Sequence, residues 1–365
     1  MTSIERVLAT VNHQQPDRVA IDYWFRDDVK ELFKGFVGVG SDEELYQFIH
    51  ADLRTVEPVY FDPEFEARTN GVLGDAVELT GGRFISHGDG SFEDLWGTIR
   101  RNGEDGLYTE WVNGPFRDND DFDAYHWPSI EIVESQASIR AKIEQIQACG
   151  DVAIKGYIDN PFKHAWQLRG LENTLCDMLI DPEFSSRLMW QCASYAKEMG
   201  LRLIRAGVDI LGIVGDIASQ TSLLFSLDCW REFIRPCLDD MIAAFKKENP
   251  DIFLFFHSDG CLDLIMPELI DTGFEIINPI QPECMDLFKF KDDYGNQVTI
   301  HGGISIQQLL PFGSVDDVHR EVRAIIDHCN TNGGYILCPA NLVQLDTPME
   351  NILALYEEAV GKPLL

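Results

Sequence analysis

Short apolar runs alternate with longer amphipathic stretches along most of the chain after residue 128. The runs are bounded by glycine, proline or polar residues and have the length of buried strands, whereas the stretches between them have helical length and spacing. The predicted strands in this part are 152–158, 208–214, 252–256, 274–277, 298–300 and 335–337. The predicted helices include 172–179, 182–206, 228–247, 262–270, 314–329 and 349–360.

Two further strands are predicted before this region, at 19–25 and around 55–59. Helix signals surround them, with Ser3 expected to cap a helix over 3–11 and Ser41 to cap a second helix with Glu44 in a capping box. Eight apolar strands separated by helices, in a chain of 365 residues, favour a closed barrel over a doubly wound sheet. We therefore predict a single α/β domain over 1–365, built as a (β/α)₈ TIM barrel.

The segment 59–127 breaks this alternation. Glycine, aspartate and aromatic residues dominate it, and only short pieces alternate between apolar and polar positions. Such a composition is typical of short strands joined by turns. The sequence predicts a β-rich insertion here that lies over one end of the barrel.

Charge and cysteine usage narrow the classes of partner. The formal net charge of -32 repels phosphate backbones and anionic lipid surfaces, which disfavours nucleic-acid and membrane binding. The nine cysteines include no CxxC pair, and no apolar run approaches the ~20 residues of a membrane helix. We expect a cytoplasmic protein with reduced thiols that acts on a small molecule, and the sequence leaves an oligomer open.

Polar side chains capable of chemistry follow nearly every predicted strand from the third onward. In a barrel of parallel strands, the carboxyl ends of the strands meet at one mouth, where active sites lie. We expect these side chains to gather there: Tyr157, Asp159, Asn160, Asp216, Gln220, His257, Asp259, Asn278, Gln281, Glu283, His301, Cys338 and Asn341.

A metal site is the most specific prediction for this mouth. An imidazole and a thiolate are preferred zinc ligands, and a catalytic zinc keeps three protein ligands and one open position. His257, Asp259 and Cys338 would supply that set, with Cys261 ranked behind Cys338. The alternatives are a buried structural thiol and a histidine that donates to a carbonyl group. Asp216 is open to three roles, as a general base, a substrate acceptor or a helix N-cap.

Several segments, in order along nearly the whole chain, resemble the uroporphyrinogen decarboxylase superfamily. The matching segments are Pro16-Asp17-Arg18-Val19, Gly170-Leu171-Glu172-Asn173, Gly215-Asp216, His257-Ser258-Asp259-Gly260, Gly273 to Gln281, His301-Gly302-Gly303-Ile304 and Gly333 to Leu337. The resemblance implies a (β/α)₈ barrel with one deep cleft at its C-terminal mouth.

The resemblance also distinguishes two branches. True decarboxylases resemble one another in an arginine-rich segment after the first strand, whereas this chain has Arg26 among acids over 22–28. A porphyrinogen with many carboxylates would be repelled there. The other branch, the zinc-dependent methyltransferases that work with corrinoid proteins, has a His-x-Cys pattern and a later cysteine. His257 and Cys338 resemble its first and last ligands, and Asp259 departs from the middle one. An oxygen ligand makes zinc a harder Lewis acid, which disfavours a thiol acceptor such as coenzyme M and favours an ether or alkoxide oxygen.

We therefore predict a zinc-dependent methyltransferase that moves a methyl group between a small substrate and cobalamin on a separate corrinoid protein. An aromatic methyl ether is the suggested substrate, which would make the protein an O-demethylase. The predicted substrate-binding residues are Tyr23, Trp24, Tyr157, Asn160, Gln220, Gln281 and His301. Two alternatives stay open. One is a metal-free decarboxylase or lyase of a small carboxylic acid, with Asp216 and His257 as acid and base. The other is a non-catalytic binder.

Overall fold

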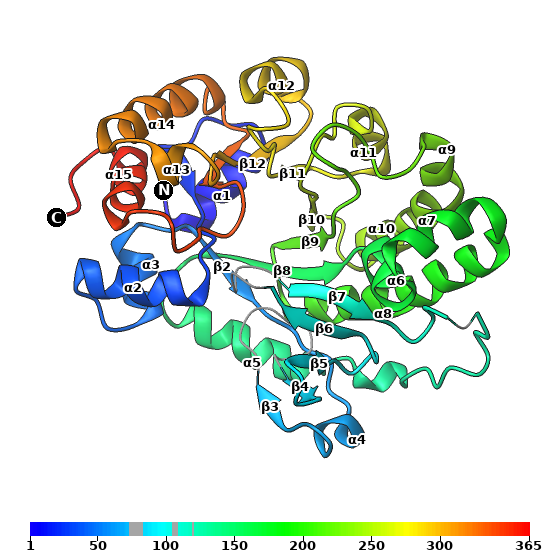
Figure 1. The fold of residues 1–365 in the computed structure, drawn as a ribbon. Coiled ribbons are helices and arrows are strands. Elements are labelled where there is room, and N and C mark those ends of the chain that lie inside the picture. Colours follow the sequence, from blue (N-terminus) through cyan, green and yellow to red (C-terminus); the bar gives the residue numbers. More distant parts are fainter. Residues whose placement is uncertain (73–82, 104–108, 119) are drawn as a thin grey trace.

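Eight parallel strands form one sheet that curves into a nearly closed barrel (Figure 1). The computed structural model describes residues 1–365 except 73–82, 104–108 and 119, which all fall inside the predicted insertion 59–127. The barrel strands are β1 (Ala20–Ile21), β2 (Leu53–Val56), β8 (Ala153–Asp159), β9 (Ile210–Val214), β10 (Phe253–His257), β11 (Ile276–Asn278), β12 (Thr299–Ile304) and β13 (Tyr335–Pro339). Their order is β1-β13-β12-β11-β10-β9-β8-β2, which confirms the predicted (β/α)₈ barrel.

Strands β1 and β2 lie at the two edges of this sheet, and side chains join them. The Asp52 amide donates to the Ile21 carbonyl at 2.8 Å, and the Ile21 amide donates to the Asp52 carboxylate at 2.9 Å. Arg6 and Arg18 both form ion pairs with that carboxylate, at 2.6 and 2.7 Å. A buried aspartate held by two guanidinium groups therefore closes the barrel where a full ladder is missing.

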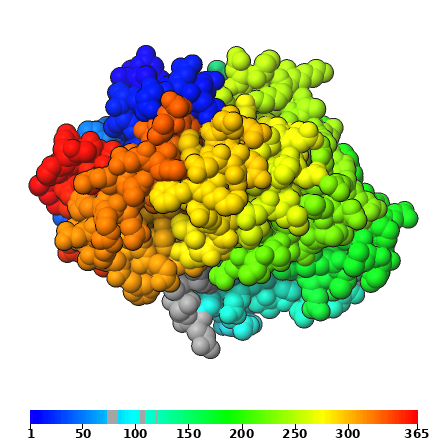
Figure 2. All heavy atoms as spheres, turned by 90° about the horizontal axis from the view of Figure 1, so that it is seen from above, coloured from blue at the N-terminus to red at the C-terminus, as the bar shows by residue number. Residues whose placement is uncertain are grey.

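Helices surround the barrel, and the part of the chain that contains α11 to α14 forms the face shown in Figure 2 in yellow to orange. The α-helices are α1 (Ser3–Val11), α2 (Asp27–Val37), α3 (Asp42–Phe48), α4 (Pro63–Glu66), α5 (Gln136–Gln147), α6 (Pro161–Arg169), α7 (Leu171–Ile180), α8 (Pro182–Ala206), α9 (Leu227–Cys229), α10 (Arg235–Glu248), α11 (Met266–Thr272), α12 (Leu287–Tyr294), α13 (Leu309–Phe312), α14 (Val315–Cys329) and α15 (Met349–Val360). Among the helices of the described residues, none has the length and apolar character needed to cross a membrane.

The helix boundaries agree closely with the sequence pattern at several places and depart from it at others, for example at α11, which begins at Met266 where the prediction began at 262. Helices α8 and α15 have the predicted bounds, and Ser41 and Glu44 form the predicted capping box of α3. The predicted helix 228–247 is a continuous helical run of α9, the π-helical turn η2 (Trp230–Ile234) and α10. The predicted cap of α1 is wrong by one residue, because Thr2 accepts the hydrogen bond from the Glu5 amide. Both residue types serve as caps, so the sequence pattern alone does not separate them.

The half of the barrel interior toward the N-terminal ends of the strands, called the lower half here, is apolar. Alternate residues of the strands point inward and pack against one another, among them Ala20, Leu53, Ala153, Ile210, Phe255, Ile276 and Ile336. Helix α1 places Val7 and Val11 against this cluster, so the helix contributes apolar side chains to the same core. The apolar lower layer leaves the C-terminal half of the barrel as the place for polar groups.

A second sheet lies between β2 and β8 in the sequence, as the predicted β-rich insertion requires (Figure 1). Its antiparallel strands are β3 (Gly71–Val72), β4 (Arg83–Ser86), β5 (Ser91–Glu93), β6 (Ile99–Asn102) and β7 (Thr109–Asn113). A short 3₁₀ turn, η1 (Ile130–Ile132), precedes α5. The sheet is attached to α6, because Trp111 Nε1 and Thr98 Oγ1 both donate to the Gln167 carbonyl, at 2.8 and 3.2 Å.

The contact between the insertion and α6 buries a histidine. The Trp96 ring lies edge-on to His164 with 4.5 Å between centroids, and His164 is 2% exposed. Among the described residues its Nε2 atom has no hydrogen-bond partner. Burial, together with the nearby positive charges of Arg100 and Lys163, lowers the pKa of His164 to about 3.

Acid should therefore destabilise the fold through His164. The unfolded chain takes up a proton at this histidine below a pH of about 6.5, whereas the folded chain does not until a pH of about 3. Folding stability is thus lost as pH falls through this window, by about 1.4 kcal/mol per pH unit from this group. Urea unfolding at pH 7, 6, 5 and 4.5 measures it, and a His164→Gln variant should show a smaller decrease by that amount. Equal pH slopes for the two proteins would contradict the assignment.

Candidate active site at the barrel mouth

A layer of polar side chains crosses the barrel above its apolar lower half. Period-two alternation along the strands points these side chains inward, as it does the apolar residues below them. All are at most 1% exposed: Asp22, Lys155, Asn278, His301 and Cys338. They come from five separate segments, so the layer exists only in the assembled barrel.

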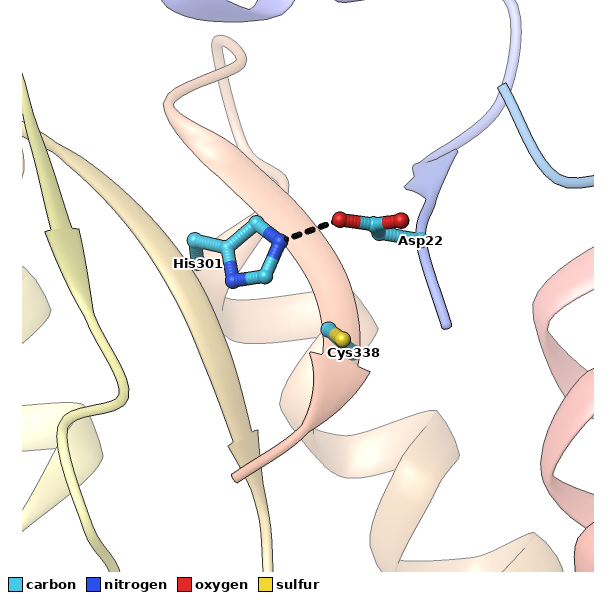
Figure 3. A group of neighbouring side chains, drawn as sticks. All are labelled: Asp22, His301 and Cys338. Atoms are coloured by element: carbon cyan, nitrogen blue, oxygen red, sulfur yellow. Dashed lines mark hydrogen bonds and ion pairs between the residues drawn. The ribbon is translucent and has the colours of Figure 1, made fainter. Parts of the chain in front are cut away.

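Asp22 and Lys155 form a buried ion pair at the centre of this layer. Asp22 Oδ2 accepts from His301 Nε2 at 2.7 Å (Figure 3). The same oxygen accepts from the Lys155 ammonium, while Asp22 Oδ1 accepts from the Tyr23 amide at 2.8 Å. Burial alone would raise the pKa of Asp22, but Lys155 and His301 outweigh it and hold that pKa below its usual value. Burial would likewise lower the pKa of Lys155, and Asp22 raises it above its usual value. Both groups are therefore charged.

Two aromatic rings lie between the polar layer and the mouth. Trp24 packs against His257, His301 and Tyr157, with ring centroids 5.3, 5.7 and 6.3 Å away. The Lys155 ammonium lies 5.8 Å from the Trp24 ring and 5.6 Å from the Tyr157 ring. Both residues are partly exposed, although the Tyr157 hydroxyl is buried.

Three potential ligands meet at the rim above these rings. Ligand atoms of Asp216, His257 and Asp259 all lie within 4.8 Å of one another, and His257 Nε2 is 3.8 Å from Asp216 Oδ1. The Asp259 amide donates to Asp216 Oδ1 at 2.9 Å, and Asn341 Nδ2 donates to Asp259 Oδ2 at 2.6 Å. The other carboxylate oxygen, Asp259 Oδ1, is buried and has no hydrogen-bond partner in the described part of the chain. Burial raises the pKa of Asp259, with Asp216 adding to the shift and His257 opposing it.

The loop that carries His257 and Asp259 is fixed by its neighbours. Ser258 Oγ accepts from the Ile217 amide at 3.0 Å, and the Gly260 amide donates to Gln281 Oε1 at 2.9 Å. Gly260 has a φ of +93°, and a Cβ atom there would lie 2.4 Å from the Ser219 carbonyl oxygen. Only glycine fits this turn, and the turn sets the position of Asp259 relative to His257.

The structure divides the predicted zinc ligands between two groups. His257 and Asp259 lie with Asp216 at the rim, whereas Cys338 lies with Asp22 and His301 in the layer below (Figure 3). Burial raises the pKa of the Cys338 thiol, and the nearby Asp22 carboxylate raises it further, so the sulfur keeps its proton. The three residues predicted together are therefore not one ligand group in this structure.

The lower group is close enough to hold an ion, yet its ligand atoms already have partners. Both ring nitrogens of His301 are hydrogen-bonded, and the Asp22 carboxylate is neutralised by the Lys155 ammonium. A second cation there would lie beside a buried positive charge, which is unfavourable. At the rim, by contrast, Asp259 Oδ1 and His257 Nε2 are free to bind a metal ion. The rim group is the better candidate for a metal.

The predicted substrate residues fall into three situations. Trp24 packs against Tyr157 and against His301, which is buried, and a substrate-binding role for these three residues stays a prediction. Tyr23 turns toward α3, where its ring stacks on Tyr46 with 3.9 Å between centroids.

Three others have structural partners or lie in solvent. Asn160 Oδ1 accepts from the Phe162 amide and caps α6, and Gln281 holds Gly260. Gln220 is exposed in the loop after β9. The suggested N-cap role of Asp216 is wrong, because the next helix is α9, which Ser226 caps, and the Asp216 carboxylate instead accepts from the Asp259 amide.

Sequence reasoning missed the buried ion pair. Lys155 lies in the middle of a predicted apolar strand, and a charge inside a buried strand is a signal that a partner lies opposite. Asp22 lies in the first predicted strand in the same way. Asn278 was among the polar residues at strand ends, but nothing in the sequence indicates which groups it joins.

Comparison with known proteins agrees with the barrel fold. The family model for uroporphyrinogen decarboxylase (URO-D) matches residues 81–361. A uroporphyrinogen decarboxylase of Chlorobium phaeobacteroides is 28% identical over 160 residues, 43% of each chain. A methylated-thiol–coenzyme M methyltransferase of Methanosarcina mazei is 24% identical over 204 residues, 56% of this chain and 52% of the relative. The matched region thus spans about half the length of these relatives. The solved structure of a methyltransferase from Methanosarcina mazei has the same fold, with a TM-score of 0.70, 17% identity and 99% of each chain covered.

Proposed function

Because the chain belongs to the uroporphyrinogen decarboxylase family, we propose that it is a methyltransferase of this fold with a zinc ion at Asp216, His257 and Asp259. The methyl group would move between a small substrate at the mouth and a corrinoid on a partner protein. One observation carries this proposal. The buried, unpartnered Asp259 Oδ1 and the Asp216 carboxylate lie beside the His257 imidazole, and a cation would stabilise this set of acceptors.

The donor set fits zinc. Imidazole nitrogen and carboxylate oxygen both bind this ion at about 2.0–2.2 Å, and three protein ligands leave one position open. Ligands of a tetrahedral zinc lie about 3.4 Å apart at those bond lengths, close to the 3.8 Å between His257 Nε2 and Asp216 Oδ1. When bound, the ion supplies Lewis acidity toward the substrate heteroatom. Two carboxylates and no thiolate favour a substrate oxygen over a substrate sulfur.

The protein itself would bind and orient the substrate. The Trp24 ring packs against His257 and Tyr157, and both aromatic residues are partly exposed, so they would suit a flat aromatic ring and therefore an aromatic methyl ether. Phe255 packs beneath them and keeps water out of the barrel interior. The partner must reach the same opening, so it would dock over the strand ends.

The charges at the mouth argue against a porphyrinogen substrate. Asp216, Asp259 and Glu283 contribute negative charge there, and Arg26 is paired with Asp28 at 2.9 Å. A substrate with many carboxylates needs several cations in a fixed arrangement. A relative named as a methylated-thiol–coenzyme M methyltransferase is compatible with methyl transfer in this fold. For this chain, the choice between a sulfur and an oxygen substrate rests on the proposed zinc ligands and not on that relative.

Metal analysis and a turnover assay test the proposal together. We expect about one zinc per chain after dialysis against buffered zinc, and loss of cob(I)alamin absorbance when the zinc-loaded protein meets 2-methoxyphenol and free cob(I)alamin. A chelator should stop this reaction, and added zinc should restore it. Zinc-free protein that decarboxylates a small acid at the same rate with and without chelator would support the metal-free lyase instead.

A further inference from the structure

A continuous chain of hydrogen bonds joins the rim to the buried ion pair. His257 Nδ1 lies 2.5 Å from Asn278 Oδ1, and Asn278 Nδ2 lies 2.8 Å from His301 Nδ1. His301 Nε2 lies 2.7 Å from Asp22 Oδ2, which also accepts from Lys155. Asn278 is the middle member, and it is fully buried.

The direction of every bond in this chain is determined at its buried end. An ionised carboxylate only accepts, so Asp22 requires a proton on His301 Nε2 and leaves His301 Nδ1 as an acceptor. Asn278 must then donate from Nδ2, which its second bond, to the His301 carbonyl at 3.0 Å, requires independently. The Asn278 oxygen therefore faces His257 and accepts from a proton on His257 Nδ1.

We infer that Asn278 is a positioning residue that holds His257 in one tautomer, with Nδ1 protonated and the Nε2 lone pair directed toward Asp216 and Asp259. The inference concerns the ring of His257 itself, and its consequence for zinc rests on the proposed function. A metal-binding histidine requires a free lone pair, and an outer hydrogen bond to the other nitrogen fixes the tautomer and the ring orientation. In this chain the Asn278 amide oxygen has that role, and the Asp22 carboxylate orients it through two hydrogen bonds, by way of His301.

The tautomer can be measured without metal. Two-bond ¹H–¹⁵N correlation spectra of the metal-free protein near neutral pH should show His257 Nε2 as the unprotonated nitrogen and His301 Nδ1 as the unprotonated nitrogen. The signals are assigned by their loss in His257→Gln and His301→Gln. A His257 ring with its proton on Nε2 in the unaltered protein would overturn the inference, whatever the protein does with zinc.

Two substitutions at one position separate positioning from packing. Asn278→Asp keeps the acceptor toward His257, so the tautomer should persist and zinc affinity should stay within a few-fold. Asn278→Leu, of similar size, removes the acceptor, so the His257 signals should move toward the other tautomer and zinc affinity should fall about 10–100-fold. Asn351→Leu is the matched control. Asn351 is 2% exposed and donates to the Leu310 and Gly313 carbonyls, so it is a buried asparagine outside the chain of hydrogen bonds to His257. It should bind zinc normally.

The outcomes distinguish the inference from the proposed function. If the unaltered protein shows the expected tautomer and Asn278→Leu loses it, the inference holds even when neither protein binds zinc, and only the proposed function fails. If the unaltered protein binds zinc and Asn278→Leu binds it equally well with unchanged His257 signals, Asn278 does not position the histidine and the inference fails.

Discussion

Replacing Asp259 by asparagine is expected to weaken zinc binding by about a hundredfold or more. Changes to groups that merely orient a ligand cost about 10–100-fold, and Asp259 would be a ligand itself. Its unpartnered Oδ1 atom is the oxygen that the ion would need, and an amide at this position removes the charge while keeping the size of the side chain. Competition titration against a zinc-binding dye measures the affinity directly.

Cys338→Ser provides the contrasting result. The Cys338 sulfur lies in the buried layer with Asp22 and His301, so we expect this variant to bind zinc as the unaltered protein does. Circular dichroism and unfolding curves should show that both variants are folded. Loss of zinc binding in Cys338→Ser would contradict the rim assignment, and loss in both variants would support the set His257, Asp259 and Cys338 expected from the sequence.

Replacing Lys155 by methionine is expected to lower the free energy of unfolding by about 3–5 kcal/mol. Lys155 is 1% exposed and Asp22 is fully buried, so removing the ammonium leaves a carboxylate without its counter-charge inside the barrel. Methionine keeps most of the length of the lysine side chain, which limits the contribution of a cavity. Urea unfolding near pH 7 measures the loss.

The double variant Asp22→Leu, Lys155→Met is the control for this explanation. Removing both charges removes the unpaired carboxylate, so the double variant should regain much of the stability that Lys155→Met loses. His301 would lose an acceptor in the double variant, which keeps the recovery below complete. If the losses in unfolding free energy of the two single variants simply add in the double variant, the two charges do not act as a pair.

Much of the fold was predictable from the sequence, because local patterns determine it. Apolar runs with turn residues at their ends identified the strands. Helix α8 begins after the capping side chain of Asp181 and ends at Gly207, and α15 ends at Gly361. The short length of β1 was not predictable. The apolar segment around it continues past Ile21, but the backbone leaves the ladder there and meets the sheet again only at an isolated bridge between Phe25 and Val343.

The site was predictable in part for a related reason. The strand-end rule correctly brought His257, Asp259 and Asp216 to one rim. Alternation also predicts that Cys338 points inward, but it does not give depth along the barrel axis. Depth depends on the stagger between strands, which is set by long-range pairing. That is why Cys338 was expected at the rim and lies in the layer below.

The pairing of β1 with β13 has a consequence for how the chain is made. Ala20 pairs with Ile336 and Ile21 with Leu337, so the first barrel strand has its ladder partner near the opposite end of the sequence. During synthesis β1 and Asp22, which follows it, become buried only after nearly the whole chain has been made. Contacts this distant in sequence slow folding, since a long loop must close before they form. Slow maturation and dependence on chaperones during translation are the expected cellular cost of this barrel.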